Sequence, residues 1–165
     1  MAEQSIQITY WKGLRGRADL VLAVASLVGA KVDYVEVLPE DLPKAYEGAA
    51  FPNLPLLTYG GEKISETAGI VSFLAEIYRP EVAGKTVLDR AIVQQICGVA
   101  MDAAFSIIKS AYIEEYEAKV PESLKGIVAK KLSYIEAHLK GKKFAVGDSV
   151  TIADVYLQVL LRTKK

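Results

Sequence analysis

The sequence holds few of the residues on which several classes of protein depend. Its 165 residues include one cysteine and one histidine, Cys97 and His138. One cysteine cannot form an internal disulfide, which suits a reducing compartment, and the two residues supply too few ligands for a zinc site. Basic and acidic residues number 20 each, and the resulting net charge of zero disfavours nucleic acid as a partner.

No uninterrupted apolar run is long enough to span a bilayer, and the N-terminal sequence MAEQSIQ lacks the basic and apolar segments of a secretory signal. We therefore expect a soluble, cytoplasmic protein with no membrane partner. A chain of this length can bury a substantial core as one domain or as two small ones.

The first part of the chain alternates between strand and helix patterns. Residues 5–11 and 32–37 alternate apolar and polar side chains, as strands with one buried face do. Between them, residues 17–27 carry apolar side chains at helical spacing, and Gly29 marks the end of the helix. This order of strand, helix and strand predicts a parallel βαβ unit with a right-handed crossover.

The stretch 51–70, FPNLPLLTYGGEKISETAGI, predicts a turn, a two-stranded hairpin and a helix start. Pro55 disfavours helical backbone at the residue before it, and the Gly-Gly pair supplies the positive φ values of a two-residue turn. Ser65 or Thr67 is expected to cap the helix that follows. A helix N-terminus beside an extended segment can hold a carboxylate and pair with a peptide backbone.

The second part of the chain shows helical patterns only. They cover residues 87–117, residues 124–139 and a last helix that opens at Thr151, where the Asp154 carboxylate is expected to return to the capping backbone. Pro80 cannot continue the helix before it. We therefore predict a domain at residues 1–79, a linker at residues 80–84 and an all-helical domain at residues 85–165.

The order βαβ-αββα followed by helices predicts an α/β thioredoxin-like N-terminal domain and an all-α C-terminal domain. Thioredoxin chemistry is excluded, because no Cys-x-x-Cys lies where the first helix begins. Four motifs resemble those of the cytosolic glutathione S-transferases of the tyrosine-using mu, sigma and pi classes. They are Tyr10-Trp11, Arg15-Gly16-Arg17-Ala18, Phe51-Pro52-Asn53-Leu54-Pro55 and Thr151-Ile152-Ala153-Asp154, within a chain that is expected to be short at its C-terminus.

The resemblance implies roles for particular residues. Tyr10 corresponds to the tyrosine that hydrogen-bonds the glutathione sulfur, and Phe51 to an aromatic key that inserts into the second subunit of a homodimer. The implied glutathione-binding residues are Trp11, Arg17, Lys44, Asn53, Leu54, Pro55, Glu66, Thr67 and, across the dimer interface, Asp102. The resemblance also implies glutathione as co-substrate, a small hydrophobic electrophile as second substrate, and no metal or other cofactor.

A tyrosine suits the activation of glutathione on physical grounds. A free cysteine thiol has a pKa of about 8.5, so most of it is protonated and unreactive at neutral pH. A phenol O–H aimed at the sulfur stabilises the thiolate by a charge-assisted hydrogen bond. Each unit by which the pKa falls requires about 1.4 kcal/mol, which is the size of one such bond.

Each assignment has a plainer alternative. Tyr10 could be an ordinary strand aromatic among nine tyrosines, Lys44 a solvated surface lysine and Thr67 a helix cap alone. Asp102 lies in the apolar segment AMDAAF, where a buried carboxylate would need a partner. The lone cysteine and the lone histidine are expected to be structural.

Two functions are open at this point. The first is a detoxifying transferase that conjugates the glutathione thiolate to small hydrophobic electrophiles, with a glutathione-dependent isomerase as a variant. The second is a non-catalytic binding or structural module with the same fold.

Overall fold

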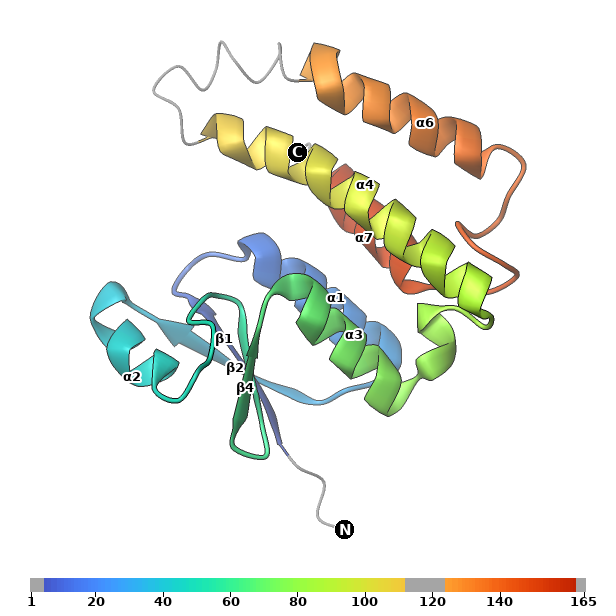
Figure 1. Cartoon of the computed structure of the whole chain (residues 1–165). Coiled ribbons are helices and arrows are strands. Elements are labelled where there is room, and N and C mark those ends of the chain that lie inside the picture. The colour runs from blue at the N-terminus through green and yellow to red at the C-terminus, as the bar shows by residue number, and fades with distance from the viewer. Residues whose placement is uncertain (1–4, 112–123, 163–165) are drawn as a thin grey trace. The chain divides into compact units, whose positions relative to one another are not determined.

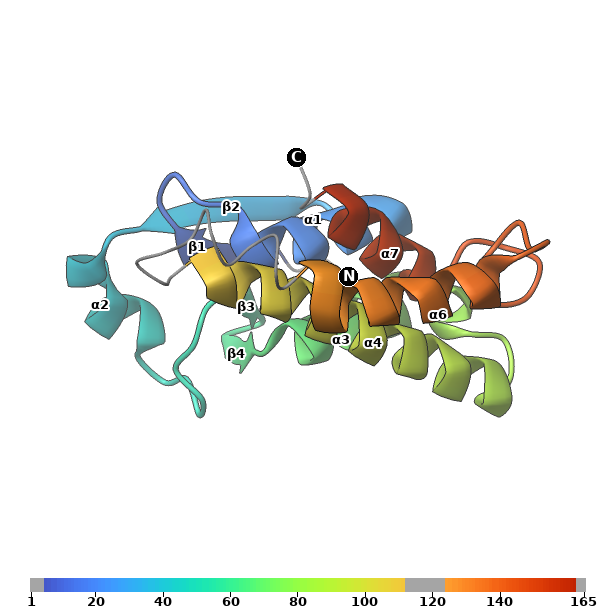
Figure 2. The same ribbon diagram turned by 90° about the horizontal axis from the view of Figure 1, so that it is seen from above.

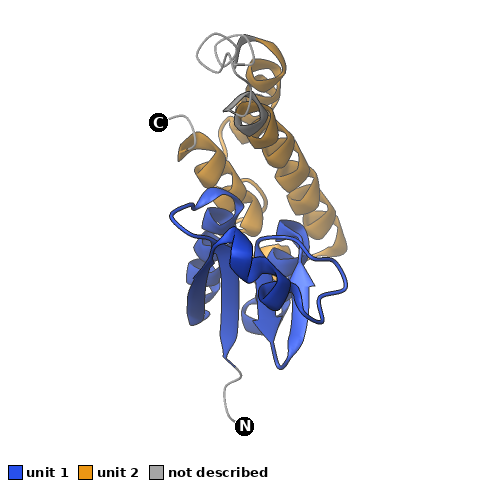
Figure 3. Cartoon of the chain, turned by 90° about the vertical axis from the view of Figure 1, so that its left-hand side faces the viewer, with its two compact units in different colours: residues 1–80 blue, residues 81–165 orange. Residues whose placement is uncertain are grey.

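The computed structural model describes residues 5–111 and 124–162 (Figure 1, Figure 2). The chain divides into two units, Met1–Pro80 and Glu81–Lys165, which Figure 3 shows in separate colours.

A four-stranded mixed sheet forms the centre of the first unit. Its strands are β1 (Ile6–Trp11), β2 (Val32–Val37), β3 (Leu56–Tyr59) and β4 (Glu62–Ser65), in the order β2-β1-β3-β4. The central strand β1 pairs in parallel with β2 and antiparallel with β3, and β4 pairs antiparallel with β3. The predicted βαβ unit is therefore confirmed.

Two helices, α1 (Gly16–Val28) and α3 (Thr67–Tyr78), pack against each other along one face of this sheet (Figure 1). Their apolar side chains form the core of the unit with alternate residues of β1. The buried members are Ile6, Ile8, Leu20, Val21, Val24, Ile70, Val71 and Leu74. Helix α1 ends at Gly29, whose φ of 76° is left-handed, as the sequence predicts.

The hairpin between β3 and β4 has the predicted two-residue turn. Gly60 and Gly61 have φ values of 58° and 90°, and the flanking residues Tyr59 and Glu62 are paired. Positive φ at both central positions matches the right-handed twist of the strands, which is why glycine suits this turn. The turn fixes the register that brings β4 to the start of α3.

Between β2 and β3, a short 3₁₀ turn (Pro39–Asp41) leads into helix α2 (Leu42–Tyr46). Lys63 of β4 holds the end of α2, because its ammonium donates to the backbone oxygens of Ala45 and Glu47 at 2.7 and 2.8 Å. These charge-assisted bonds satisfy carbonyls that the end of a helix leaves without partners.

All regular secondary structure that the structure describes in the second unit is helical. Its main helices are α4 (Val87–Ala111), α6 (Ala129–Leu139) and α7 (Ile152–Arg162). They run side by side, with α4 in contact with both of the others (Figure 2). The thioredoxin-like first unit and the helical second unit confirm the predicted fold class.

Two segments of the second unit differ in detail from the sequence-based expectation. The helix expected over residues 124–139 is not regular, because Gly126 has non-helical φ and ψ of −91° and −115° within a π-helical turn (Leu124–Val128) that precedes α6. Helix α4 is described to Ala111, and the remainder of the helix expected over residues 87–117 lies outside the described residues.

The segment expected as a linker forms a 3₁₀ helix, Pro80–Ala83, in which Val82 and Ala83 are buried. The segment is therefore a partly buried helical turn and not an exposed, extended linker. No helix among the described residues has the length and apolar character needed to cross a membrane.

Candidate functional site

Tyr10 lies at the junction of β1 and the N-terminus of α1. It is 8% exposed, and its hydroxyl oxygen accepts a hydrogen bond of 3.1 Å from the backbone N–H of Arg17. That N–H is one of the donors that the first turn of a helix leaves without an intrahelical partner. Since the Tyr10 oxygen accepts this hydrogen bond, the hydroxyl proton can be donated to a ligand. A hydrogen bond accepted by a hydroxyl group and one donated by it strengthen each other.

Gly16 makes this arrangement possible. A Cβ atom on Gly16 would lie 2.5 Å from the Tyr10 hydroxyl oxygen, closer than such atoms ever approach, and its φ of 37° also favours glycine. The sequence analysis named Gly16 only as a member of the Arg15-Gly16-Arg17-Ala18 motif, so its role was missed. A glycine at the start of a helix that follows a strand tyrosine is the signal that could have indicated it.

Two side chains of β2 hold the loop that follows Tyr10. The Glu36 carboxylate accepts from the Gly13 N–H at 3.1 Å, and the Tyr34 hydroxyl donates to the Leu14 carbonyl at 3.2 Å. The Arg15 guanidinium lies over the Tyr34 ring, 5.5 Å from its centroid, and burial raises the pKa of Tyr34. Neither β2 residue carried a sequence signal, because both sit in an ordinary alternating strand.

Leu54 belongs to the same buried cluster as Tyr10. The cluster also contains Ala18, Val37 and Leu56, and Trp11 packs against it. The Leu54–Pro55 peptide bond is cis. The strand that carries the candidate activator and the turn that is expected to bind the glutathione backbone therefore meet in one place.

Glu66 begins helix α3 with an unusual backbone. Its φ is 66°, and it is the only non-glycine residue with positive φ in the part of the chain that the structure describes. The plainer alternative, a helix capped by Ser65 or Thr67, is not what the structure shows, because Glu66 is the N-cap and no side chain caps the helix. Capping propensity favoured the two hydroxyl residues, but the turn from β4 into α3 places Glu66 at the junction.

Asn53 and Glu66 are joined by a hydrogen bond of 2.7 Å from the amide nitrogen of Asn53 to the carboxylate. The Asn53 side-chain oxygen also accepts from the Leu54 N–H at 3.0 Å. Thr67, the first residue of α3, is buried. Four of the residues that the resemblance assigned to glutathione thus lie in one connected group, around a helix N-terminus whose donors no side chain covers.

Lys44 and Phe51 are both exposed. Lys44 lies on α2, whose Leu42, Ala45 and Tyr46 pack against the cluster that contains Tyr10 and Leu54. Phe51 is 77% exposed, which is unusual for an aromatic side chain of this size. The structure shows no contact that joins either side chain to the Tyr10 group.

Asp102 corrects one step of the sequence argument. The sequence argument was that a carboxylate buried in this segment would need a partner, but the Asp102 side chain is 70% exposed, and it accepts a bond of 2.7 Å from Lys131 of α6. The apolar neighbours in AMDAAF lie on other faces of α4, which is why the local composition was misleading.

Thr151 and Asp154 form a closed cap at the start of α7. One Asp154 oxygen accepts from the Thr151 N–H at 2.8 Å and from the Thr151 hydroxyl at 2.9 Å, while the other accepts from the Ala145 N–H at 2.8 Å. The carboxylate therefore joins the helix start to the turn before it.

The lone cysteine and the lone histidine have structural surroundings. Cys97 is buried, and burial raises the pKa of its thiol to about 12. The Nε2 atom of the His138 ring lies 2.8 Å from the Ala145 carbonyl oxygen. Among the described residues, no three histidine, cysteine, aspartate or glutamate side chains gather as a metal site would require.

With this geometry established, comparison with known proteins defines the class. The family model for the glutathione S-transferase C-terminal domain matches residues 96–163. Among solved structures, a Nu-class glutathione S-transferase from Haemonchus contortus superposes with a TM-score of 0.82 and 25% identity, over 96% of this chain and 80% of that one. The enzyme from Ascaris lumbricoides gives a TM-score of 0.81 and 26% identity over the same shares.

Curated relatives give the same result. Mouse glutathione S-transferase Mu 2 is 35% identical over 107 residues, which are 65% of this chain and 48% of the relative. Elongation factor 1-gamma of Schizosaccharomyces pombe is 25% identical over 96% of this chain and 41% of its own length. The chain thus spans about half the length of the curated relatives it matches. Residues 96–163 match the family model, and the chain as a whole is similar to the cytosolic glutathione S-transferases in sequence and in fold.

Proposed function

We propose that this protein binds glutathione, ionises its thiol with Tyr10 and transfers it to small hydrophobic electrophiles in a detoxifying role. The observation that carries the proposal is the hydrogen bond from the Arg17 N–H to the Tyr10 hydroxyl. It fixes the phenol at the end of β1 and leaves its proton for the glutathione sulfur, where a charge-assisted bond favours the thiolate.

The remaining groups serve to hold the tripeptide. The uncapped start of α3 offers N–H groups and a positive dipole end to the γ-glutamyl carboxylate, beside Glu66 and Thr67. The backbone of Leu54 pairs with the cysteinyl part, and Lys44 takes the glycine carboxylate. Trp11 and Arg17 line the sulfur end, and no metal or other cofactor takes part.

The test replaces Tyr10 by phenylalanine. For conjugation of an aryl halide, Tyr10→Phe is expected to lower kcat/KM at least about tenfold, since one charged hydrogen bond to the thiolate is lost. Glutathione affinity stays within about twofold, because the other contacts hold the peptide. Tyr59→Phe, which removes the hydroxyl of a tyrosine on the neighbouring strand β3, is the matched control.

Gly16→Ala sharpens the test without altering Tyr10 itself. The added methyl group would collide with the phenol oxygen and displace it. Turnover should fall as in Tyr10→Phe, and the pH at which bound glutathione ionises, followed by thiolate absorbance, should rise in both variants. Unchanged turnover in Tyr10→Phe would remove Tyr10 from the mechanism.

A second candidate is a non-catalytic binding module. The match to elongation factor 1-gamma over nearly the whole chain favours it, since that relative is named for translation rather than for a transferase reaction. Retention of the protein on immobilised glutathione without turnover of any aryl halide or isomerisable substrate would select this candidate.

We further propose a cytoplasmic homodimer in which Phe51 inserts into the second subunit and Asp102 reaches the partner's bound glutathione. The exposure of Phe51 supports the first part, and the exposure of Asp102 leaves its carboxylate accessible for the second. Light scattering of the protein and of Phe51→Ser tests it. The variant should have half the mass of the original if Phe51 joins the subunits.

A further inference from the structure

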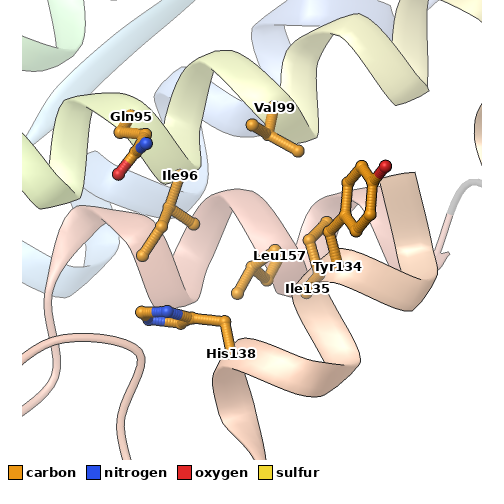
Figure 4. A pocket seen from close by; sticks show the side chains of 7 residues that line it. All are labelled: Gln95, Ile96, Val99, Tyr134, Ile135, His138 and Leu157. Atoms are coloured by element: carbon orange, nitrogen blue, oxygen red, sulfur yellow. The ribbon is translucent and has the colours of Figure 1, made fainter. Parts of the chain in front are cut away.

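The second unit contains a pocket that the proposed glutathione chemistry does not use. It lies between α4, α6 and α7 and has a volume of about 250 Å³ (Figure 4). All of its lining residues belong to the second unit, so Tyr10, Leu54 and Glu66 take no part in it.

The pocket exists because α6 packs less closely than its neighbours. Helices α4 and α7 bury Ile96 and Leu157 between them, whereas no residue of α6 is fully buried. Figure 4 shows Ile96 and Val99 of α4 and Ile135 of α6 projecting toward the space above Leu157. The floor and walls of the pocket are therefore aliphatic.

The rim of the pocket is polar, and the Lys142 ammonium lies beside it. The rim consists of the Gln95 amide, the Tyr134 phenol and the His138 imidazole. His138 Nε2 lies 2.8 Å from the Ala145 carbonyl oxygen, and the Lys142 ammonium lies 3.4 Å from Nδ1 and 3.3 Å from Nε2 of the same ring. An apolar cavity with a few hydrogen-bonding groups at its mouth is the usual form of a small-molecule site in a helical bundle.

We propose that this pocket binds a small, uncharged, planar aromatic molecule that carries one hydrogen-bonding group, of the phenol or naphthol class. The size fits, because an engineered apolar cavity of about 150 Å³ already holds benzene. The ring lies against Ile96, Val99 and Leu157, with the Tyr134 ring at its edge. The polar group meets the Gln95 and Tyr134 side of the rim, and an ammonium ion is excluded because the Lys142 ammonium lies beside His138 and no acidic side chain among the described residues lines the pocket to compensate its desolvation.

The experiment titrates the full chain with 1-naphthol by calorimetry and by ligand-observed NMR. A dissociation constant on the order of 100 µM is expected for a ligand of this size. 1-Naphthylmethylammonium, of similar shape but positively charged, should bind at least about tenfold more weakly. Saturation with glutathione should leave the 1-naphthol affinity unchanged, which separates this pocket from an electrophile site next to the bound thiol.

Two variants locate the binding. Val99→Phe fills the pocket and should weaken 1-naphthol binding at least about tenfold, while Gly98→Ala, whose added Cβ meets nothing within 4 Å, should leave it unchanged. Tyr134→Ala serves if Val99→Phe does not fold, since Tyr134 is exposed and its loss removes only the aromatic edge.

The proposal is overturned if 1-naphthol fails to bind at about 1 mM, if Val99→Phe or Tyr134→Ala binds it as the original does, or if glutathione displaces it. It is independent of the proposed transferase activity, so a protein without turnover that binds 1-naphthol in the expected way would still support it.

Discussion

Two helix starts in this protein use similar residues for opposite purposes. At α7, Thr151 and Asp154 close the helix on itself, and the carboxylate accepts three hydrogen bonds from its own chain. At α3, the sequence also offers Ser65, Glu66 and Thr67, yet no side chain caps the helix. The Glu66 carboxylate instead accepts from Asn53, and Glu66 occupies a left-handed backbone conformation.

The difference separates a helix start that its own side chains close from one that they leave open. A helix N-terminus carries three or four N–H groups without partners and a partial positive charge. Where the chain satisfies them, as at α7, the result is stability. Where it does not, as at α3, the groups are left for an anion, and a backbone strained at that position is typical of a functional site. This comparison leads to four predictions.

The largest effect is expected at the closed helix start. Asp154→Ala removes the acceptor of two backbone N–H groups and one hydroxyl, and should lower the free energy of unfolding by about 3 kcal/mol, measured by urea denaturation. Asp33→Ala, which changes an exposed aspartate on β2, is the control and should stay within about 0.5 kcal/mol. A loss at Asp154 no greater than the control's would contradict the closed-cap interpretation.

The open helix start should respond in the opposite way. Glu66→Gly relieves the positive φ and should keep or raise the free energy of unfolding, by up to about 1 kcal/mol. The same change should weaken glutathione binding about tenfold by calorimetry, since the carboxylate beside the γ-glutamyl group is gone. Glu62→Gly, in the adjacent strand, should instead lose stability and leave binding unchanged. If Glu66→Gly lowered both the free energy of unfolding and the affinity for glutathione, the proposed difference between the two helix starts would be contradicted.

A third prediction concerns the C-terminal end of α2, where Lys63 binds two backbone oxygens. Lys63→Met should loosen the helix that carries Lys44 and raise KM for glutathione about fivefold. Binding of γ-glutamylcysteine, which lacks the glycine carboxylate, should not change. Lys31→Met is the surface control, and an equal loss for both peptides would show that Lys63 supports the fold in general.

The smallest effect is expected in the turn before α7, where Lys85 and Asp148 are in contact at 2.5 Å. The hydrogen bond and charge of Lys85 hold the pKa of the Asp148 carboxyl below its usual value. Because the pKa of Asp148 is lower in the folded than in the unfolded protein, its ionised carboxylate stabilises the fold at pH values above the unfolded-state pKa. This contribution is lost as the pH falls through the pKa of the folded state. Lys85→Met should therefore lower Tm slightly at pH 7, and the difference should begin to shrink near pH 4 and vanish only below the lowered pKa of Asp148. A difference that persists at low pH would point to packing by the lysine stem.

The features that could be predicted from sequence depend on local rules. The alternation in β1 and β2, the Gly-Gly hairpin and the Gly29 stop all follow from residues within a few positions of one another. Tyr10 and Leu54 were named from motifs, and the structure places them in one cluster because β1 and β3 are neighbours in the sheet.

The features that were missed depend on contacts between residues far apart in the sequence or on an unusual backbone conformation. The cap at Glu66 was missed because a positive φ on a glutamate has no sequence signature. The pairing of Asp102 with Lys131 joins two helices, and the support of α2 by Lys63 crosses from one element to another. Such contacts exist only after the fold has formed, so residue spacing alone does not show them.

The burial of Cys97 has a practical consequence. It is the only cysteine in the sequence, and a thiol with a pKa near 12 is almost entirely un-ionised at neutral pH. Alkylating reagents should therefore reach it only when α4 opens, so the speed at which the native protein takes up one label reports that opening directly. The same property keeps the protein's own sulfur from consuming the electrophiles that it is proposed to hand to glutathione.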